Sequence, residues 1–129
     1  MAEIKAQNPT SGTVMYFVPF AIKHGETKEH TLASLDGGTA LFNVKLIGVS
    51  VGHVYTYKVS GTVTSKFVPN VMVTHISESG IPDVPGKRNI VLSVRNDDTF
   101  VANISTTDLD TVTWSGSVEM LWGAKVLNV

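Results

Sequence analysis

The stretch that decides the fold is Val54-Tyr55-Thr56-Tyr57-Lys58-Val59-Ser60-Gly61-Thr62-Val63-Thr64. Its apolar side chains (Tyr55, Tyr57, Val59 and Val63) share one parity, and its polar side chains share the other. Because successive side chains of a strand point to opposite faces, this period of two predicts a half-buried β-strand. Residues 111–122 alternate in the same way, with an apolar face formed by Val112, Trp114, Val118, Met120 and Trp122. Gly116 lies on that face and is a candidate for a bend or bulge.

Weaker apolar runs fill the rest of the chain, at residues 15–22, 41–49, 67–76, 89–95 and 99–105. The expected inward side chains in the clearest of these runs are Phe42, Val44, Leu46, Ile90, Leu92, Val94, Phe100, Ala102 and Ile104. Residues 28–35 are read as a further strand, with a helical turn as the alternative, and residues 78–88 are expected to be a surface loop. Glycine, proline, asparagine and aspartate punctuate the runs as turn signals. This spacing predicts an all-β, antiparallel β-sandwich of jelly-roll type with about eight strands.

The domain organisation follows from the length of 129 residues, which favours one domain. Residues 1–13 are polar, contain Pro9 and Gly12, and are expected to form an N-terminal arm with no core of its own. Residues 14–129 are expected to form the single β-sandwich domain. We expect the arm to dock on a neighbouring subunit or to lie on its own domain.

Composition excludes several classes of function. With ten Lys and Arg against eleven Asp and Glu, the chain lacks the basic footprint expected of a nucleic-acid-binding protein. The absence of cysteine excludes disulfides, thiolate nucleophiles and Cys-ligated metals. The sequence has neither a secretory signal nor the run of about 20 apolar residues needed for a membrane helix, so no membrane partner is expected.

Catalytic, metal and cofactor signatures are not found in the sequence. The four histidines form no local ligand pair; His24 and His30 are expected to be solvated, and His53 and His75 half-buried. The acidic pairs Asp97-Asp98 and Asp108-x-Asp110 flank one predicted strand, and turn chemistry explains each better than calcium binding. We therefore predict no catalytic residue, no metal site and no cofactor. A hydrolase would need a buried histidine–carboxylate pair in a cleft.

An oligomer interface is predicted where apolar residues depart from the alternating pattern. Residues 15–20 are apolar on both parities, and the C-terminal tail is apolar where a solvated end would be polar. The predicted interface residues are Met15, Tyr16, Phe17, Phe20, Val126 and Leu127.

A second candidate site lies in residues 77–88, the densest mixture of hydroxyl, carboxylate and cationic groups in the chain. Carbohydrate sites are built from such groups. On this alternative the ligand-binding residues are Ser77, Glu78, Asp83, Lys87 and Arg88, whereas an ordinary hydrophilic connection explains the same composition without a ligand.

The last strand, from Thr113-Trp114-Ser115-Gly116 to Leu121-Trp122-Gly123, resembles the closing strand of C1q/TNF-like jelly-roll modules, which often have an aromatic-Ser-Gly step. Bacterial TNF-like lectins of similar length also end such a strand in Trp-Gly. The resemblance covers about a dozen residues and implies a trimer packed on an aromatic axis, a form that lectins and phage decoration proteins share.

The function expected from these observations is that of a non-enzymatic structural protein of a virion, such as a phage capsid decoration protein. It would form a homo-oligomer, with a trimer favoured, on the surface of a capsid or similar particle. The alternative is an oligomeric lectin of TNF-like fold that binds glycans, located in the cytoplasm or released without a signal peptide.

Overall fold

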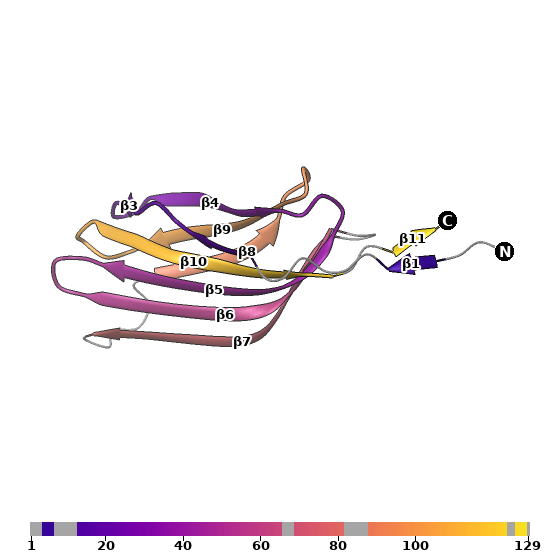
Figure 1. The fold of residues 1–129 in the computed structure, drawn as a ribbon. Helices are drawn as coiled ribbons and strands as arrows, with labels where there is room; N and C mark the ends of the chain where they lie inside the picture. Colours follow the sequence, from indigo (N-terminus) through magenta and orange to yellow (C-terminus); the bar gives the residue numbers. More distant parts are fainter. Residues whose placement is uncertain (1–3, 7–12, 66–68, 82–87, 124–125, 129) are drawn as a thin grey trace.

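The chain is all-β in the computed structural model, which describes residues 4–6, 13–65, 69–81, 88–123 and 126–128. These residues form eleven strands and no helix, and every strand pair is antiparallel. Nine of the strands make two sheets that lie face to face (Figure 1). The prediction of an antiparallel β-sandwich is confirmed, with nine sandwich strands in place of about eight.

The larger sheet has six strands. Its order is β2-β10-β5-β6-β7, and β3 pairs with β10 beyond the end of β2. The strands are β2 (Thr13–Tyr16), β3 (Phe20–Ile22), β5 (Thr39–Val49), β6 (Val54–Thr64), β7 (Asn70–Ile81) and β10 (Val112–Trp122). The break between β2 and β3 contains Pro19, which has no backbone N–H for a sheet ladder.

The smaller sheet has three strands in the order β4-β9-β8. They are β4 (Thr27–Ser34), β8 (Arg88–Val94) and β9 (Thr99–Thr106). The helical turn considered for residues 28–35 is therefore wrong. The jelly-roll part of the prediction is not confirmed, because β5, β6 and β7 are consecutive neighbours in a meander and β8 and β9 form a hairpin.

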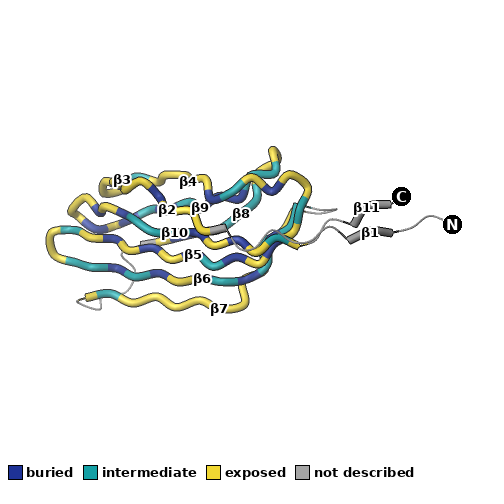
Figure 2. Tube along the Cα trace, in the orientation of Figure 1, coloured by how far each residue is buried: buried dark blue, intermediate teal, exposed yellow. Residues whose placement is uncertain are grey.

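The core lies between the two sheets, where the predicted inward side chains meet. Burial alternates strictly along β5 and along β6, its neighbour in the same sheet (Figure 2). Phe42 of β5 contacts Phe100 of β9 across the core, with ring centroids 5.0 Å apart. The predicted inward residues of β5, β6 and β9 are buried, as are Val112, Trp114, Val118 and Met120 of β10, whereas Trp122 is partly buried.

Close backbone approach explains the glycine at position 116 in β10. The register of β10 against β5 runs without a shift through Gly116, so the predicted bend or bulge is not there. A Cβ on Gly116 would lie 2.1 Å from the carbonyl oxygen of Lys45, so only glycine lets the two strands approach so closely. The register shift occurs instead between β6 and β7, at Ser60 and Gly61.

The two ends of the chain pair with each other. β1 (Ile4–Ala6) and β11 (Val126–Asn128) form a separate two-stranded ribbon, in which Ala6 is opposite Val126 and Lys5 is opposite Leu127. Figure 1 places this ribbon beside the sandwich. Most of the predicted arm, residues 1–3 and 7–12, lies outside the described residues.

Candidate functional site

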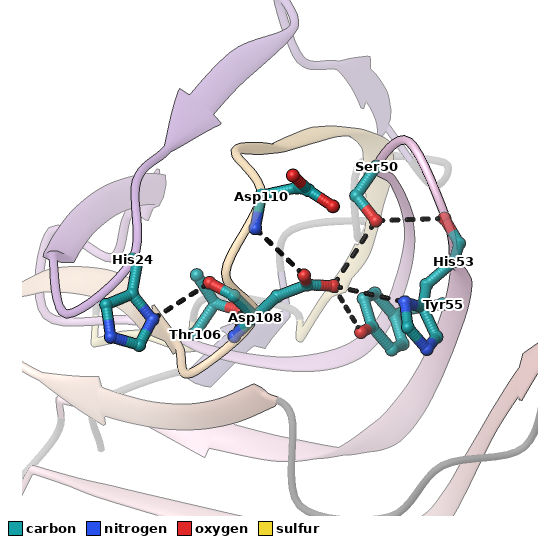
Figure 3. Close-up of polar contacts among 7 residues, drawn as sticks. All are labelled: His24, Ser50, His53, Tyr55, Thr106, Asp108 and Asp110. Atoms are coloured by element: carbon teal, nitrogen blue, oxygen red, sulfur yellow. Dashed lines mark hydrogen bonds and ion pairs between the residues drawn. The ribbon is translucent and has the colours of Figure 1, made fainter.

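A buried carboxylate, Asp108, organises one end of the sandwich in the turn between β9 and β10. Its Oδ2 accepts hydrogen bonds from the Tyr55 hydroxyl at 2.6 Å and the Ser50 hydroxyl at 3.2 Å (Figure 3). Its Oδ1 accepts from the backbone N–H of Asp110 at 3.1 Å. Tyr55 is the second residue of β6 and its first buried one, so its hydroxyl needs a partner at this end of the core.

Two histidines lie around the same turn. Nδ1 of His53 is 3.5 Å from Oδ2 of Asp108, and its ring stacks on Tyr55 with centroids 5.6 Å apart. Nδ1 of His24 is 3.0 Å from the backbone carbonyl oxygen of Asp108. The turn after β9 is thereby fastened both to the β5–β6 hairpin and to the β3–β4 turn.

The pKa of Asp108 lies below its ordinary value. Burial by itself would raise this pKa, but the hydrogen bonds from Tyr55, the Asp110 amide and Ser50, with His53 close by, outweigh that effect. Asp108 is therefore held as a carboxylate, the form that accepts all three hydrogen bonds.

Serine, histidine and aspartate meet here, but not in the order that hydrolysis requires. In a catalytic triad the histidine lies between the other two and takes the serine proton. Here the Ser50 hydroxyl donates to the carboxylate of Asp108, and its second contact is the backbone carbonyl oxygen of His53 at 3.5 Å. The arrangement stabilises turns; it does not activate a nucleophile.

Sequence reasoning missed this cluster. It predicts Asp108 as a turn residue and His53 as half-buried, and does not join them because Asp108 is 58 residues from Ser50 and 53 residues from Tyr55. One signal was present: a tyrosine on the apolar face of a strand, near the strand end, needs a buried acceptor for its hydroxyl. His24 is exposed, as expected, and its Nδ1 also reaches the backbone carbonyl oxygen of Asp108.

An exposed apolar patch lies at the β2 edge of the larger sheet. The other lateral edge of this sheet is β7. We define the N-terminal apolar patch as Val14, Met15, Tyr16 and Val18. Tyr16 is 80% exposed and Val18 is 83% exposed. Of the predicted interface residues, Met15 and Tyr16 are thus available at the surface. Val126 and Leu127 lie in β11, paired with β1.

Phe17 and Phe20 do not belong to that free surface, which corrects their prediction as interface residues. Phe17 is buried in the core, and Phe20 is partly buried against it. Both rings hold His30 of β4, Phe20 stacked at 4.6 Å and Phe17 edge-on at 4.5 Å between centroids. His30, expected to be solvated, instead closes the core behind the break between β2 and β3.

Burial lowers the pKa of His30 because it disfavours the charged imidazolium. Below about pH 6.5 the unfolded chain binds a proton at this residue before the folded chain does, so the free energy of unfolding should fall as the pH is lowered through that range. We expect His30→Phe, which keeps an aromatic ring, to reduce this loss. Urea unfolding of the wild-type protein and of His30→Phe, at pH 7.5 and at pH 5.5, measures the loss in the free energy of unfolding. Equal losses in the two proteins would contradict the role of His30.

Residues 77–88, predicted as a carbohydrate-binding loop, belong in part to strands β7 and β8. Ser77 and Glu78 are exposed residues within β7, not in a loop, and Arg88 is the first residue of β8. The strand continues to Ile81 because its register with β6 extends to Val54. Glu78 lies opposite Tyr57. Burial of the Tyr57 hydroxyl raises the Tyr57 pKa, and the negative charge of Glu78 adds a smaller effect in the same direction. Asp83 and Lys87 lie outside the described residues.

A second charged cluster closes the β8–β9 hairpin. Arg95 donates to Glu29 at 2.8 Å and to both carboxylate oxygens of Asp97. The hydrogen bonds from Arg95 lower the Asp97 pKa to about 2. A surface hollow of about 430 Å³ is lined by Arg95, Asn96 and Asp97, but both carboxylates already occupy the guanidinium donors. Because β9 separates Asp97 from Asp108, the two acidic pairs lie at opposite ends of that strand, as predicted.

Metal and membrane signatures were sought in the part of the chain that the structure describes. There, no group of three histidine, aspartate or glutamate side chains is placed to hold a metal ion. Over the same residues, no helix has the length and apolar character to cross a membrane.

Comparison of the chain with family models, curated proteins and solved structures found no match. The comparisons therefore give no support to the resemblance of the last strand to C1q/TNF-like modules. Any functional argument has to rest on the surfaces and clusters of this chain itself.

Proposed function

We propose that this chain is a non-enzymatic structural protein of a virion, such as a capsid decoration protein, that associates through exposed apolar surface. The N-terminal apolar patch carries the proposal. Its four side chains lie within five consecutive residues, and an edge that faced water throughout would not need them. Contact with a capsid or similar particle would remove this apolar area from water, at about 25 cal/mol per Å² before association costs.

The polar clusters support the same proposal. Asp108 and its partners fasten turns, and Arg95 with its two acids closes a hairpin, so the best-organised charged groups among the described residues act within the fold. Their side-chain donors and acceptors are directed at one another. The surface that remains for a partner is flat sheet and exposed strand.

Self-association is part of the proposal. The comparisons give no support to the resemblance from which the trimer was expected, so the native mass in solution decides between a trimer and any other oligomer. The lectin alternative has less support, because Ser77 and Glu78 lie along an exposed strand and not in the predicted loop.

Co-sedimentation with candidate capsids tests the particle contact. We expect the wild-type protein to bind saturably, and Tyr16→Ser combined with Val18→Ser to weaken binding at least about tenfold, since about two apolar side chains are lost from the interface. Val51→Ser is the matched control: Val51 is 92% exposed, lies alone in the β5–β6 turn, and should be neutral.

Two outcomes would contradict the proposal. One is a wild-type protein that sediments with none of the particles. The other is reproducible binding to one sugar family on a glycan array, abolished by Arg88→Ala, which would favour the lectin.

A further inference from the structure

Among the described residues the two sheets have four lateral edges, and at three of them the strands are shorter than at the fourth, β7. The edge formed by β2 and β3 is short, four and three residues, with Pro19 in the gap. β4 has a register shift between Thr31 and Ala33 and carries Lys28 and Glu29. β8 is seven residues long. Short strands, prolines, bulges and charges are the usual protections of a sheet edge.

The fourth edge, β7, is the longest, although it has a register shift of its own at Thr74. It has twelve residues, pairs with β6 alone among the described strands, and contains one formally charged side chain, Glu78. Eight consecutive residues, 72–79, are exposed, so both faces of the strand meet water (Figure 2). Its apolar side chains Met72, Val73, Ile76 and Ile81 are exposed too, with Ile76 at 60%.

The register shift in β7 leaves a long regular segment. Thr74 is the extra residue, and its hydroxyl donates to the Ser60 carbonyl oxygen at 3.1 Å. Residues 75–81 then run in unbroken register against Val54 to Ser60. At about 3.3 Å per residue, this gives about 23 Å of regular edge.

We propose that β7 pairs antiparallel with β7 of a second copy, about a two-fold axis perpendicular to the sheet. The unpaired backbone groups of a strand edge are best satisfied by another strand, and every copy of this chain presents the same edge. One two-fold contact satisfies both edges and joins the two larger sheets into one continuous sheet.

The side chains of β7 suit a copy of the same strand. A two-fold axis perpendicular to the sheet keeps each face on its own side, so Val73 and Ile76 of the two copies meet in one apolar strip. Glu78 is the only formally charged residue of β7. A register whose two-fold axis lies away from Glu78 keeps the Glu78 carboxylates of the two copies apart. The biological role of this pairing rests on the proposed function. The pairing itself can be tested on the isolated protein, without a particle.

Sedimentation equilibrium at micromolar concentrations tests the pairing. We expect a native mass of about 28 kDa, twice the 13.9 kDa chain, for the wild-type protein. Ile76→Lys should shift the protein to monomer, weakening association at least about tenfold, because a lysine in the apolar strip discourages pairing of a strand edge. Ile47→Lys is the matched control, since Ile47 is 49% exposed on β5 in the interior of the same sheet and should leave the dimer intact. A monomeric or trimeric wild-type protein, or a dimeric Ile76→Lys variant, would overturn the proposal.

Single cysteines locate the axis, since the chain has none of its own. A two-fold antiparallel pair puts one residue opposite itself, at the 4.4–6.8 Å Cα separation that a disulfide spans. Cysteine is placed in turn at Ile76, Ser77, Glu78 and Ser79, and at exposed Val91 of β8 as the control. Mild oxidation should give a covalent dimer at one β7 position and none at Val91. Equal cross-linking at all five positions would contradict the pairing. If the β7 test fails while particle binding persists, the proposed function stands without this interface.

Discussion

Asp108→Ala should lower the free energy of unfolding by about 3 kcal/mol. The substitution removes the acceptor of the Tyr55 hydroxyl at 2.6 Å and of the Asp110 amide at 3.1 Å, and leaves the Tyr55 hydroxyl in the core. A buried donor without a partner costs about 1–3 kcal/mol, and hydrogen bonds to a charged acceptor are among the stronger ones. Urea unfolding followed by tryptophan fluorescence at pH 7 measures the loss.

Asp110→Ala is the control for this prediction. Asp110 enters the cluster through its backbone N–H (Figure 3), which the substitution keeps, and its side chain is exposed. Its effect should be within about 0.5 kcal/mol. An Asp108→Ala variant as stable as Asp110→Ala would show that the cluster does not hold the turn.

The lowered pKa of Asp108 adds a dependence on pH. A carboxylate whose folded pKa lies below its unfolded value of about 3.9 stabilises the fold above that value, and the stabilisation is lost as the pH falls through the folded pKa. Acid destabilisation in this range should therefore be smaller in Asp108→Ala than in the wild-type protein.

Gly116→Ala should prevent folding or lower the free energy of unfolding by more than about 3 kcal/mol. The new Cβ would lie 2.1 Å from the Lys45 carbonyl oxygen and 2.8 Å from Cδ2 of Leu46. Backbone of a central strand pair cannot move aside without breaking the β10–β5 ladder, so the clash is relieved only by separating the strands. Soluble yield and thermal unfolding measure the effect.

Gly52→Ala is the matched glycine control. Gly52 lies in the β5–β6 turn, where an added Cβ would meet nothing within 4 Å. Its melting temperature should stay close to that of the wild-type protein. A Gly116→Ala variant with the same melting temperature as Gly52→Ala would contradict the close approach of β10 and β5.

The strands of the core were predictable from local pattern. Tyr55, Tyr57 and Val59 alternate with polar residues because β6 has one face in the core, and that alternation is visible in sequence. Phe17 shows where such reasoning stops. Its segment is apolar on both parities, and burial of Phe17 depends on His30 arriving from another strand.

Two further features were beyond local pattern. β7 was expected to end near Ile76, because turn-forming residues follow, but pairing with β6 extends it to Ile81. The Asp108 cluster joins residues from the β5–β6 hairpin and the β9–β10 turn, whose proximity only the sheet topology creates. Both depend on long-range pairing, which residue spacing does not encode.

Amide hydrogen exchange of β7 tests most directly whether this chain works by joining its strand edge to another copy. At low concentration the amides of residues 75–81 that are not bonded to β6 should exchange rapidly, since no other described strand of the chain pairs with this edge. At a concentration where the dimer predominates, the same amides should become protected, while those of the β8 edge stay unchanged. Rapid exchange of the β7 amides at every concentration would contradict the account.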